Sequence, residues 1–143
     1  LQASRGNCTA LADGTTAGTL YAGVQDAANA ARIYKSVDAG KTWTALAFAL
    51  PGRLVTELVQ LPGGRLVAGL RDGAKGVAGK NDSGAIYYSD DGGATWNPST
   101  GAGGAAVAGI AFNRTTELVA LTTTGTTAAL FTSADGITWS PSE

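Results

Sequence analysis

Residues 36–43, Ser-Val-Asp-Ala-Gly-Lys-Thr-Trp, form a motif that occurs three times in the 143-residue sequence. It returns as Ser-Asp-Asp-Gly-Gly-Ala-Thr-Trp at 89–96 and, one residue shorter, as Ser-Ala-Asp-Gly-Ile-Thr-Trp at 133–139. All three tryptophans of the chain close a copy of the motif. A unit that recurs about every 45 residues is typical of repeat proteins, in which each unit buries its apolar face against the next.

Three short apolar runs precede each copy of the motif, and each run has the length and composition of a β-strand bounded by turn residues. The first runs are Cys8–Ala12, Glu57–Leu61 and Val107–Phe112. The second are Leu20–Val24, Leu66–Leu70 and Leu118–Leu121, and the third are Ile33–Lys35, Ile86–Tyr88 and Leu130–Thr132. We expect a fourth strand to begin at each tryptophan and to end at Leu46, Pro98 or Pro141. The sequence therefore predicts a single all-β domain over 1–143, with four-stranded antiparallel repeats at about 7–50, 52–100 and 103–143.

The connections between the second and third strands are predicted to differ in length. We expect loops over Val24–Ile33, over Arg71–Gly84 and, shortest, over Thr122–Ala128. The glycine-rich segment Gly101–Ala106 matches a dinucleotide fingerprint only in letters, because no strand leads into it and no helix follows. It is interpreted as a flexible linker between repeats.

The motif itself is predicted to form a hairpin turn between the third and fourth strands. Short polar side chains bond backbone groups in such turns, glycine supplies a positive φ, and tryptophan presents an apolar ring to the core. The residues predicted to build the three turns are Ser36, Asp38, Gly40, Thr42, Trp43, Ser89, Asp91, Gly93, Thr95, Trp96, Ser133, Asp135, Gly136, Thr138 and Trp139. We expect all three tryptophans to be largely buried in equivalent positions.

These copies resemble the Asp-box, or BNR repeat, of sialidases, sortilin-type receptors, xyloglucan-cleaving glycosidases and photosystem II assembly factors. The resemblance implies propeller-type blades, with the Asp-box at the blade periphery and away from any active centre. A calcium loop at Asp90–Gly93 is the alternative for this motif, but no bidentate carboxylate follows Asp91 as a good calcium site requires. No cofactor and no metal are expected.

Catalysis by this chain is not expected. It contains no histidine and a single cysteine, so acyl transfer lacks a base. The sialidase-type Arg-Ile-Pro motif is half present, at Arg32-Ile33-Tyr34, and a glycosidase needs two carboxylates facing each other across a cleft. The acids outside the motif, such as Asp26, Asp72 and Asp82, are predicted to lie in loops.

The composition argues against a nucleic-acid-binding protein and against a membrane-spanning one. Ten basic and eleven acidic residues leave a net charge of -1, without the basic surface that nucleic-acid binding needs. No apolar run reaches membrane-spanning length. Cys8 is expected to be a buried inert thiol, with an intermolecular disulfide or a thioether link as the alternative. Asn7, Asn81 and Asn113 begin N-x-[ST] triplets, which act as glycosylation sites only on a secretory route.

Two functions remain open. Three blades cannot close a ring, because propellers typically have about 4–8 blades. The first hypothesis is a non-catalytic, secreted or cell-surface interaction module that self-associates as a dimer or head-to-tail polymer, or that adjoins further blades of a longer chain. The second is a carbohydrate-binding segment of a sialidase- or glycosidase-like protein.

Overall fold

The computed structural model describes residues 6–51, 53–72, 85–113 and 117–142, which form twelve strands in three antiparallel sheets. We call the sheets blades 1, 2 and 3. Blade 1 contains β1 (Asn7–Asp13), β2 (Leu20–Gln25), β3 (Ala30–Ser36) and β4 (Thr44–Pro51). Blade 2 contains β5 (Arg53–Gln60), β6 (Leu66–Asp72), β7 (Ala85–Ser89) and β8 (Asn97–Pro98). Blade 3 contains β9 (Ala106–Phe112), β10 (Leu118–Thr124), β11 (Thr127–Ser133) and β12 (Ser140–Pro141).

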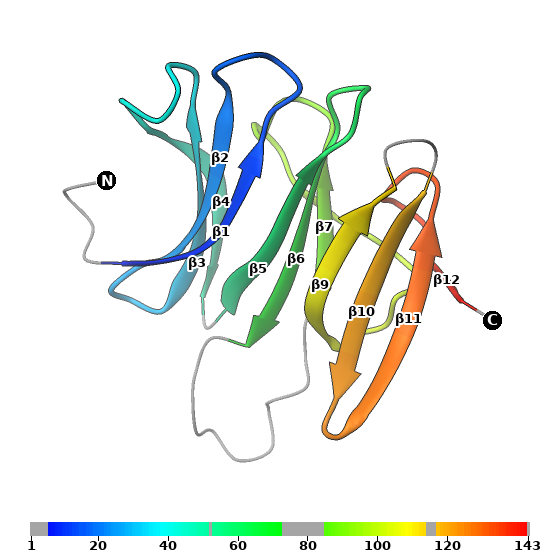
Figure 1. The fold of residues 1–143 in the computed structure, drawn as a ribbon. Coiled ribbons are helices and arrows are strands. Elements are labelled where there is room, and N and C mark those ends of the chain that lie inside the picture. The colour runs from blue at the N-terminus through cyan, green and yellow to red at the C-terminus, as the bar shows by residue number, and fades with distance from the viewer. Residues whose placement is uncertain (1–5, 52, 73–84, 114–116, 143) are drawn as a thin grey trace.

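The blades stand side by side in chain order, and each is a meander whose strands pair with their sequence neighbours (Figure 1). The predicted all-β fold of four-stranded, propeller-type blades is confirmed. The described part of the chain contains no helix, and therefore no helix that could span a membrane.

The hydrophobic core lies between the blades, in two separate clusters. Between blades 1 and 2, Tyr21 and Ile33 pack with Val55 and Leu58, and all four are at most 4% exposed. A second cluster between blades 2 and 3 includes Val67, Ile86, Val107 and Ile110. Blade 2 thus buries one face against blade 1 and the other against blade 3.

Two glycines let the blades approach closely. A Cβ atom on Gly23 would lie 2.7 Å from Cβ of Val55, and one on Gly69 would lie 2.6 Å from Cγ1 of Val107. In blade 3 the equivalent position of β10 is Leu121, which is 40% exposed because the described residues contain no blade after blade 3.

The connections differ from those predicted. The alanine-rich segment 24–33 is mostly strand, and only residues 26–29 turn. Its turn is closed by the carboxylate of Asp26, which accepts the N–H groups of Ala28 and Ala30, both at 2.9 Å. Ala31 is fully buried, so a small side chain is favoured there by packing and not by loop chemistry.

Two further strands are longer than predicted. β10 and β11 extend through most of segment 122–128 and leave only Gly125 and Thr126 between them, with Gly125 at φ 59°. β4 continues to Pro51 instead of ending at Leu46. In blade 2, β6 ends at Asp72, and the rest of the predicted Arg71–Gly84 loop lies outside the described residues.

The predicted flexible linker is instead anchored to blade 3. The N–H of Thr100 donates to the carbonyl of Ile137 at 2.8 Å, and the N–H of Trp139 donates to the carbonyl of Thr100 at 2.9 Å. Gly101 approaches the Trp139 backbone so closely that a Cβ atom there would collide with its carbonyl oxygen. Backbone pairing, which the glycine-rich composition hides, holds this segment in place.

Candidate functional site

The turn at residues 36–43 is closed by a hydrogen-bond network around one serine and one aspartate. The hydroxyl of Ser36 donates to Oδ1 of Asp38 at 2.8 Å and accepts the N–H of Gly40 at 2.9 Å. The carboxylate of Asp38 then accepts the N–H of Thr42 at 2.8 Å and its hydroxyl at 2.5 Å. The side chains of Ser36, Asp38 and Thr42 are therefore all engaged within the turn.

The second copy repeats this geometry. Ser89 donates to Asp91 at 2.8 Å and accepts the N–H of Gly93 at 2.9 Å, while Asp91 accepts the N–H and hydroxyl of Thr95 at 2.8 and 2.6 Å. Gly93, like Gly40, lies at positive φ, as this turn requires.

The third copy, one residue shorter, keeps the serine–aspartate pair with altered acceptor geometry. Oδ1 of Asp135 accepts the hydroxyl of Ser133 at 3.1 Å and the N–H groups of Ile137 and Thr138 at 2.8 and 3.1 Å. The N–H of Gly136 donates to the Ser133 hydroxyl at 2.8 Å. The deletion is thus absorbed in the turn, and the strands on either side still pair.

These hydrogen bonds stabilise the charged form of each aspartate. The hydroxyl and then the N–H of Thr42 lower the pKa of Asp38 to about 2, and those of Thr95 lower the pKa of Asp91 to about 2. Partial desolvation raises the pKa of Asp135, but the N–H groups of Ile137 and Thr138 outweigh it, so this pKa also lies below its usual value. All three groups are anionic acceptors at neutral pH.

The tryptophans are bonded alike but are not equally buried. Each indole N–H donates to the glycine carbonyl of its own turn, at 3.0, 3.2 and 3.3 Å in blades 1, 2 and 3. Trp139 is 2% exposed, whereas Trp43 and Trp96 are half-buried. Burial is therefore complete for Trp139 and partial for the other two.

The tryptophans pack against different neighbours, and a preceding blade alone does not bury them, because Trp96 has one and is only half-buried. Trp139 belongs to the apolar cluster between blades 2 and 3, which includes Val67. Trp96 lies against Phe48 of blade 1, with ring centroids 5.0 Å apart. For Trp43 no preceding blade exists among the described residues.

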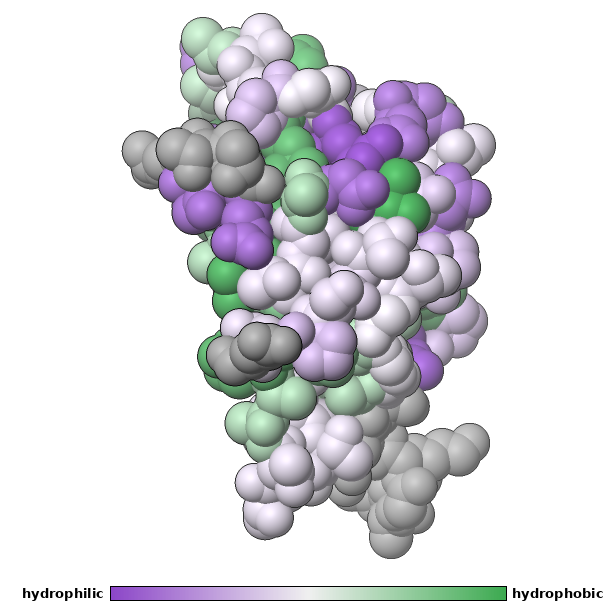
Figure 2. Space-filling model, turned by 90° about the vertical axis from the view of Figure 1, so that its right-hand side faces the viewer, coloured by the Kyte–Doolittle hydropathy of each residue, from purple (hydrophilic) through white to green (hydrophobic). Residues whose placement is uncertain are grey.

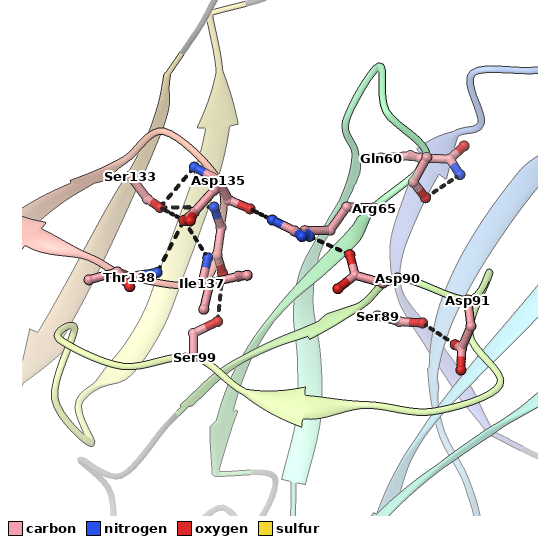
Figure 3. A network of polar contacts seen from close by, with 12 residues as sticks. Gln60, Arg65, Ser89, Asp90, Asp91, Ser99, Ser133, Asp135, Ile137 and Thr138 are labelled. Atoms are coloured by element: carbon pink, nitrogen blue, oxygen red, sulfur yellow. Dashed lines mark hydrogen bonds and ion pairs between the residues drawn. The ribbon is translucent and has the colours of Figure 1, made fainter.

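Arg65, in the turn before β6, connects the Asp-box turns of blades 2 and 3 (Figure 3). Its Nε donates to Asp90 at 2.5 Å, its Nη1 donates to the carbonyl of Asp135 at 2.8 Å, and its guanidinium lies 5.5 Å from the ring centroid of Tyr88. The hydrogen bond to Asp90 raises the pKa of Arg65 further. Sequence reasoning missed this residue, because its partners are distant in sequence.

Asp90 thus faces an arginine, and Asp91 faces its own turn. In the described ranges, no group of three or more His, Cys, Asp or Glu residues is arranged to hold a metal ion. Arg32, from the half-present sialidase-type motif, pairs instead with Asp26, with Nε and Oδ2 3.0 Å apart.

Glu57, on β5, is a second residue that the sequence did not single out. Burial raises its pKa, whereas the pKa values of Asp26 and of the three Asp-box aspartates are lowered. It pairs across the sheet with Gly69, where β1 has Ala10 and β9 has Gly109. A carboxylate between blades, where small residues otherwise stand, gave no recognisable signal in the sequence.

The remaining predicted residues lie at the surface. Asn7 and Asn113 are exposed, and Oδ1 of Asn113 accepts the N–H of Glu117 at 3.1 Å; Asn81 lies outside the described residues.

Cys8 is exposed, contrary to the expected buried thiol. Its counterparts in the other blades, Val55 and Val107, are buried because a preceding blade covers them.

Comparisons with known proteins agree with this geometry. Residues 87–98 match the BNR/Asp-box repeat family, and no curated protein sequence matches the chain. The structure is similar to the GH74 enzyme of Niastella koreensis, with 25% identity, a TM-score of 0.64, and coverage of 91% of this chain and 20% of that one.

Two further solved structures share the fold. YCF48 bound to D1 peptide has 18% identity and a TM-score of 0.60, over 95% of this chain and 39% of its own. The α-L-arabinofuranosidase of Fusarium graminearum in complex with an iminosugar inhibitor has 17% identity and a TM-score of 0.64, over 98% and 49%. The chain therefore spans less than half the length of each of these proteins. Its described residues form a three-blade array of the β-propeller type, built from Asp-box repeats.

Proposed function

We propose that this chain is a non-catalytic interaction module, secreted or at the cell surface, that works through protein association at its end blades. The proposal depends mainly on what the two end faces expose. Leu11 of blade 1 is 68% exposed, whereas the residues in the same register of blades 2 and 3, Leu58 and Ile110, are 4% and 8% exposed.

The other end shows the same contrast. Leu130 of blade 3 is 49% exposed, whereas its counterparts in blades 1 and 2, Ile33 and Ile86, are 0% and 3% exposed. Both leucines thus occupy positions that are buried wherever a neighbouring blade is present. Exposed apolar surface of this kind marks sites of protein association.

The engagement of the acids supports a non-catalytic role. Asp26 pairs with Arg32, Asp90 pairs with Arg65, and the Asp-box aspartates accept hydrogen bonds inside their turns. Glycoside hydrolysis needs an acid with a raised pKa and a second carboxylate a few ångströms across a cleft. Burial raises the pKa of Glu57, but the other acids named here are held by an arginine or by their own turns.

A carbohydrate-binding segment is the second candidate, and the likeness to two glycosidase-type structures favours it. In such a segment, Tyr or Trp rings would stack on sugars beside an amide or carboxylate. Half-buried Tyr34 and Trp43 are the rings available on the open side of blade 1.

The test measures activity, glycan binding and association on the same purified chain. We expect no hydrolysis of aryl arabinofuranosides, no calorimetric signal with arabinan or xyloglucan oligosaccharides, and a particle heavier than one chain in light scattering. Hydrolysis would refute the non-catalytic role, and saturable glycan binding lost on Trp43→Ala would favour the carbohydrate-binding alternative. Detection of the chain in the culture medium or only in the cell lysate tests the proposed location.

A further inference from the structure

We infer that the open face of blade 1, which carries Leu11, packs against the open face of blade 3, which carries Leu130, in a second copy of this chain. Two copies joined in this way at both ends close a ring of six blades. The inference rests on the proposed function, because it names the partner for the association proposed there.

The joint between blades 2 and 3 shows how one blade edge is fixed to the next Asp-box turn. The hydroxyl of Ser99 donates to the carbonyl of Gly136 at 2.6 Å, and the next residue, Thr100, exchanges backbone hydrogen bonds with Ile137 and Trp139 at 2.8 and 2.9 Å. This edge therefore holds the turn of the following blade by both side chain and backbone.

The end of blade 3 repeats the residues that make this joint. Trp-Asn-Pro-Ser at 96–99 returns as Trp-Ser-Pro-Ser at 139–142. The N–H of Ser99 donates to the carbonyl of Ile86 at 2.8 Å, and the N–H of Ser142 donates to the carbonyl of the equivalent Leu130 at 2.9 Å. Ser142 thus occupies the same position at the edge of blade 3 as Ser99 does in blade 2. Its hydroxyl could donate to the Asp-box turn of another blade in the same way.

Among the described residues, the Asp-box turn of blade 1 has no such neighbour. A Cβ atom on Gly93 or Gly136 would meet the preceding blade, at Leu46 and at Val67 respectively. On Gly40 it would meet only its own blade, at 3.5 Å from Leu20 and 3.8 Å from Trp43. The Gly40 carbonyl accepts the Trp43 indole, and a carbonyl has a second lone pair, which in Gly136 accepts Ser99.

The open faces of blades 1 and 3 also differ from the buried faces in side-chain size at two equivalent positions. Blade 3 has Leu121 where blades 1 and 2 have glycine, and blade 1 has Cys8 where blades 2 and 3 have the valines that meet those glycines. A larger residue on one face thus opposes a smaller one on the other. Viewed from the blade-3 side, the surface is mostly pale and weakly polar, with hydrophobic areas, and its hydrophilic residues gather towards one end (Figure 2).

The charges at the joint are complementary as well. Arg65 precedes β6 and reaches the Asp-box turn of the next blade, and Glu117 precedes β10 in the same way. The turn of blade 1 carries Lys41 between Gly40 and Thr42. An exposed glutamate on one face and an exposed lysine on the other favour a head-to-tail pair over a head-to-head one.

The size of the ring agrees with propeller geometry. Six blades fall within the usual range of about 4–8 for closed propellers. The chain covers 49% of the arabinofuranosidase chain with which it shares the fold, so two copies match the length of that protein. A second copy would add three blades whose open faces match those of the first.

The first measurement is the particle mass. We expect light scattering of the purified chain to give twice its mass of 14.2 kDa. Leu11→Lys and Leu130→Lys should each halve the mass while far-UV circular dichroism stays unchanged, because both side chains are exposed in the single chain.

Val37→Lys is the matched control. Val37 is as exposed as Leu11, at 68%, but its counterparts Asp90 and Ala134 stay exposed even where a blade joint is formed. This variant should therefore remain a dimer.

Cys8, the single cysteine, reports on the joint independently of mass. In the dimer we expect its thiol to be protected from a maleimide reagent, and Leu130→Lys to remove that protection. Leu130 lies in blade 3 and Cys8 in blade 1, so an effect of one on the other has to pass between copies.

A folded particle of one chain with a reactive Cys8 would overturn the inference, and so would a dimer that survives both leucine variants. An open polymer would overturn the six-blade ring. The proposed function survives each of these outcomes if another protein binds the end faces. Glycoside hydrolysis, in contrast, would remove the proposed function and leave the joint intact.

Discussion

At the level of single residues, the Asp-box turns depend on aspartates that are already ionised. Because hydrogen bonds from Thr42 and Thr95 lower the pKa of Asp38 and Asp91 to about 2, these groups favour the folded state wherever they are charged. Their contribution is complete above the ordinary aspartate pKa and is lost as the pH falls through the folded value. Acid should therefore weaken the turns before it affects the apolar core.

This gives a first prediction. The melting temperature should fall between about pH 4 and pH 2, and Asp38→Asn should reduce that fall while lowering the melting temperature at pH 7. Asp13→Asn, at an exposed aspartate outside the turns, is the control and should keep the wild-type acid profile. A profile identical for both variants would contradict this role of Asp38.

Glu57 behaves in the opposite sense. Its raised pKa means that the folded protein favours the protonated side chain, so its favourable contribution at low pH is lost as the pH rises through that pKa. We predict that Glu57→Gln raises the melting temperature at pH 7 and has little effect at about pH 4. Thermal melts at the two pH values check this, and a lower melting temperature at pH 7 would show that the carboxylate has a partner.

The turn residues could be predicted from sequence because each turn is local. Ser36, Asp38 and Thr42 bond one another within a few positions, so their spacing contains the whole interaction. Arg65 and Glu57 could not be predicted, because neither residue repeats and the partners of Arg65 are distant in sequence.

At the level of elements, the segment between blades 2 and 3 depends on one glycine. Gly101 lies at φ 94°, and its missing side chain leaves room for the Trp139 carbonyl. Gly104, three residues on, has no atom within 4 Å of the place a Cβ would take.

We therefore predict that Gly101→Ala destabilises the chain by more than about 1 kcal/mol, since both the backbone angle and the contact are unfavourable. Gly104→Ala should leave stability nearly unchanged or raise it slightly. Chemical denaturation of the two variants measures the difference, and equal stability would mean that this segment is not anchored in solution.

The tryptophans give a second prediction at this level. Trp139→Ala should cost about 3–5 kcal/mol, as is usual for truncating a buried aromatic side chain, and Trp43→Ala should cost clearly less. Both are best compared in the Leu130→Lys background, where the blade-1 face stays uncovered. Equal losses would indicate that Trp43 is covered even in the single chain.

The strands were predictable where apolar runs lay between turn residues, and the second run of every blade lies within an observed strand. The connections were not, because composition alone makes 24–33 and 122–128 look like loops. In the first, Asp26 tightens the turn and buried Ala31 packs between blades; in the second, a glycine at positive φ allows a two-residue turn.

At the level of the whole molecule, repeat count and motif predicted the blade architecture but not which positions are covered. The tryptophans have the same motif and different exposure. Trp96 packs against Phe48 of blade 1 and is half-buried, whereas Trp139 is buried in a cluster that also contains Ala102 of the segment between blades 2 and 3. The repeated sequence predicts the fold of one blade, whereas the burial of a residue depends on the segments and blades that pack around it.

The contacts of Asp90 and Asp91 also bear on whether a bound metal ion stabilises the protein. Asp90 faces Arg65 and Asp91 faces its own turn, so we predict that a chelator leaves the melting temperature unchanged. Thermal melts with and without EDTA test this. If EDTA lowered the melting temperature and Asp91→Ala abolished that response, the Asp-box of blade 2 would be a calcium site.

The outermost strands have one more consequence, for solubility. β8 and β12 are two residues long and each ends in a proline, which leaves little unpaired backbone for another strand to add to. β4 is eight residues long, has no proline before Pro51, and pairs only with β3. Among the fourth strands of the three blades, β4 is therefore the one at which chains at high concentration would add strand to strand and aggregate, and where one inward-facing lysine would act as a gatekeeper.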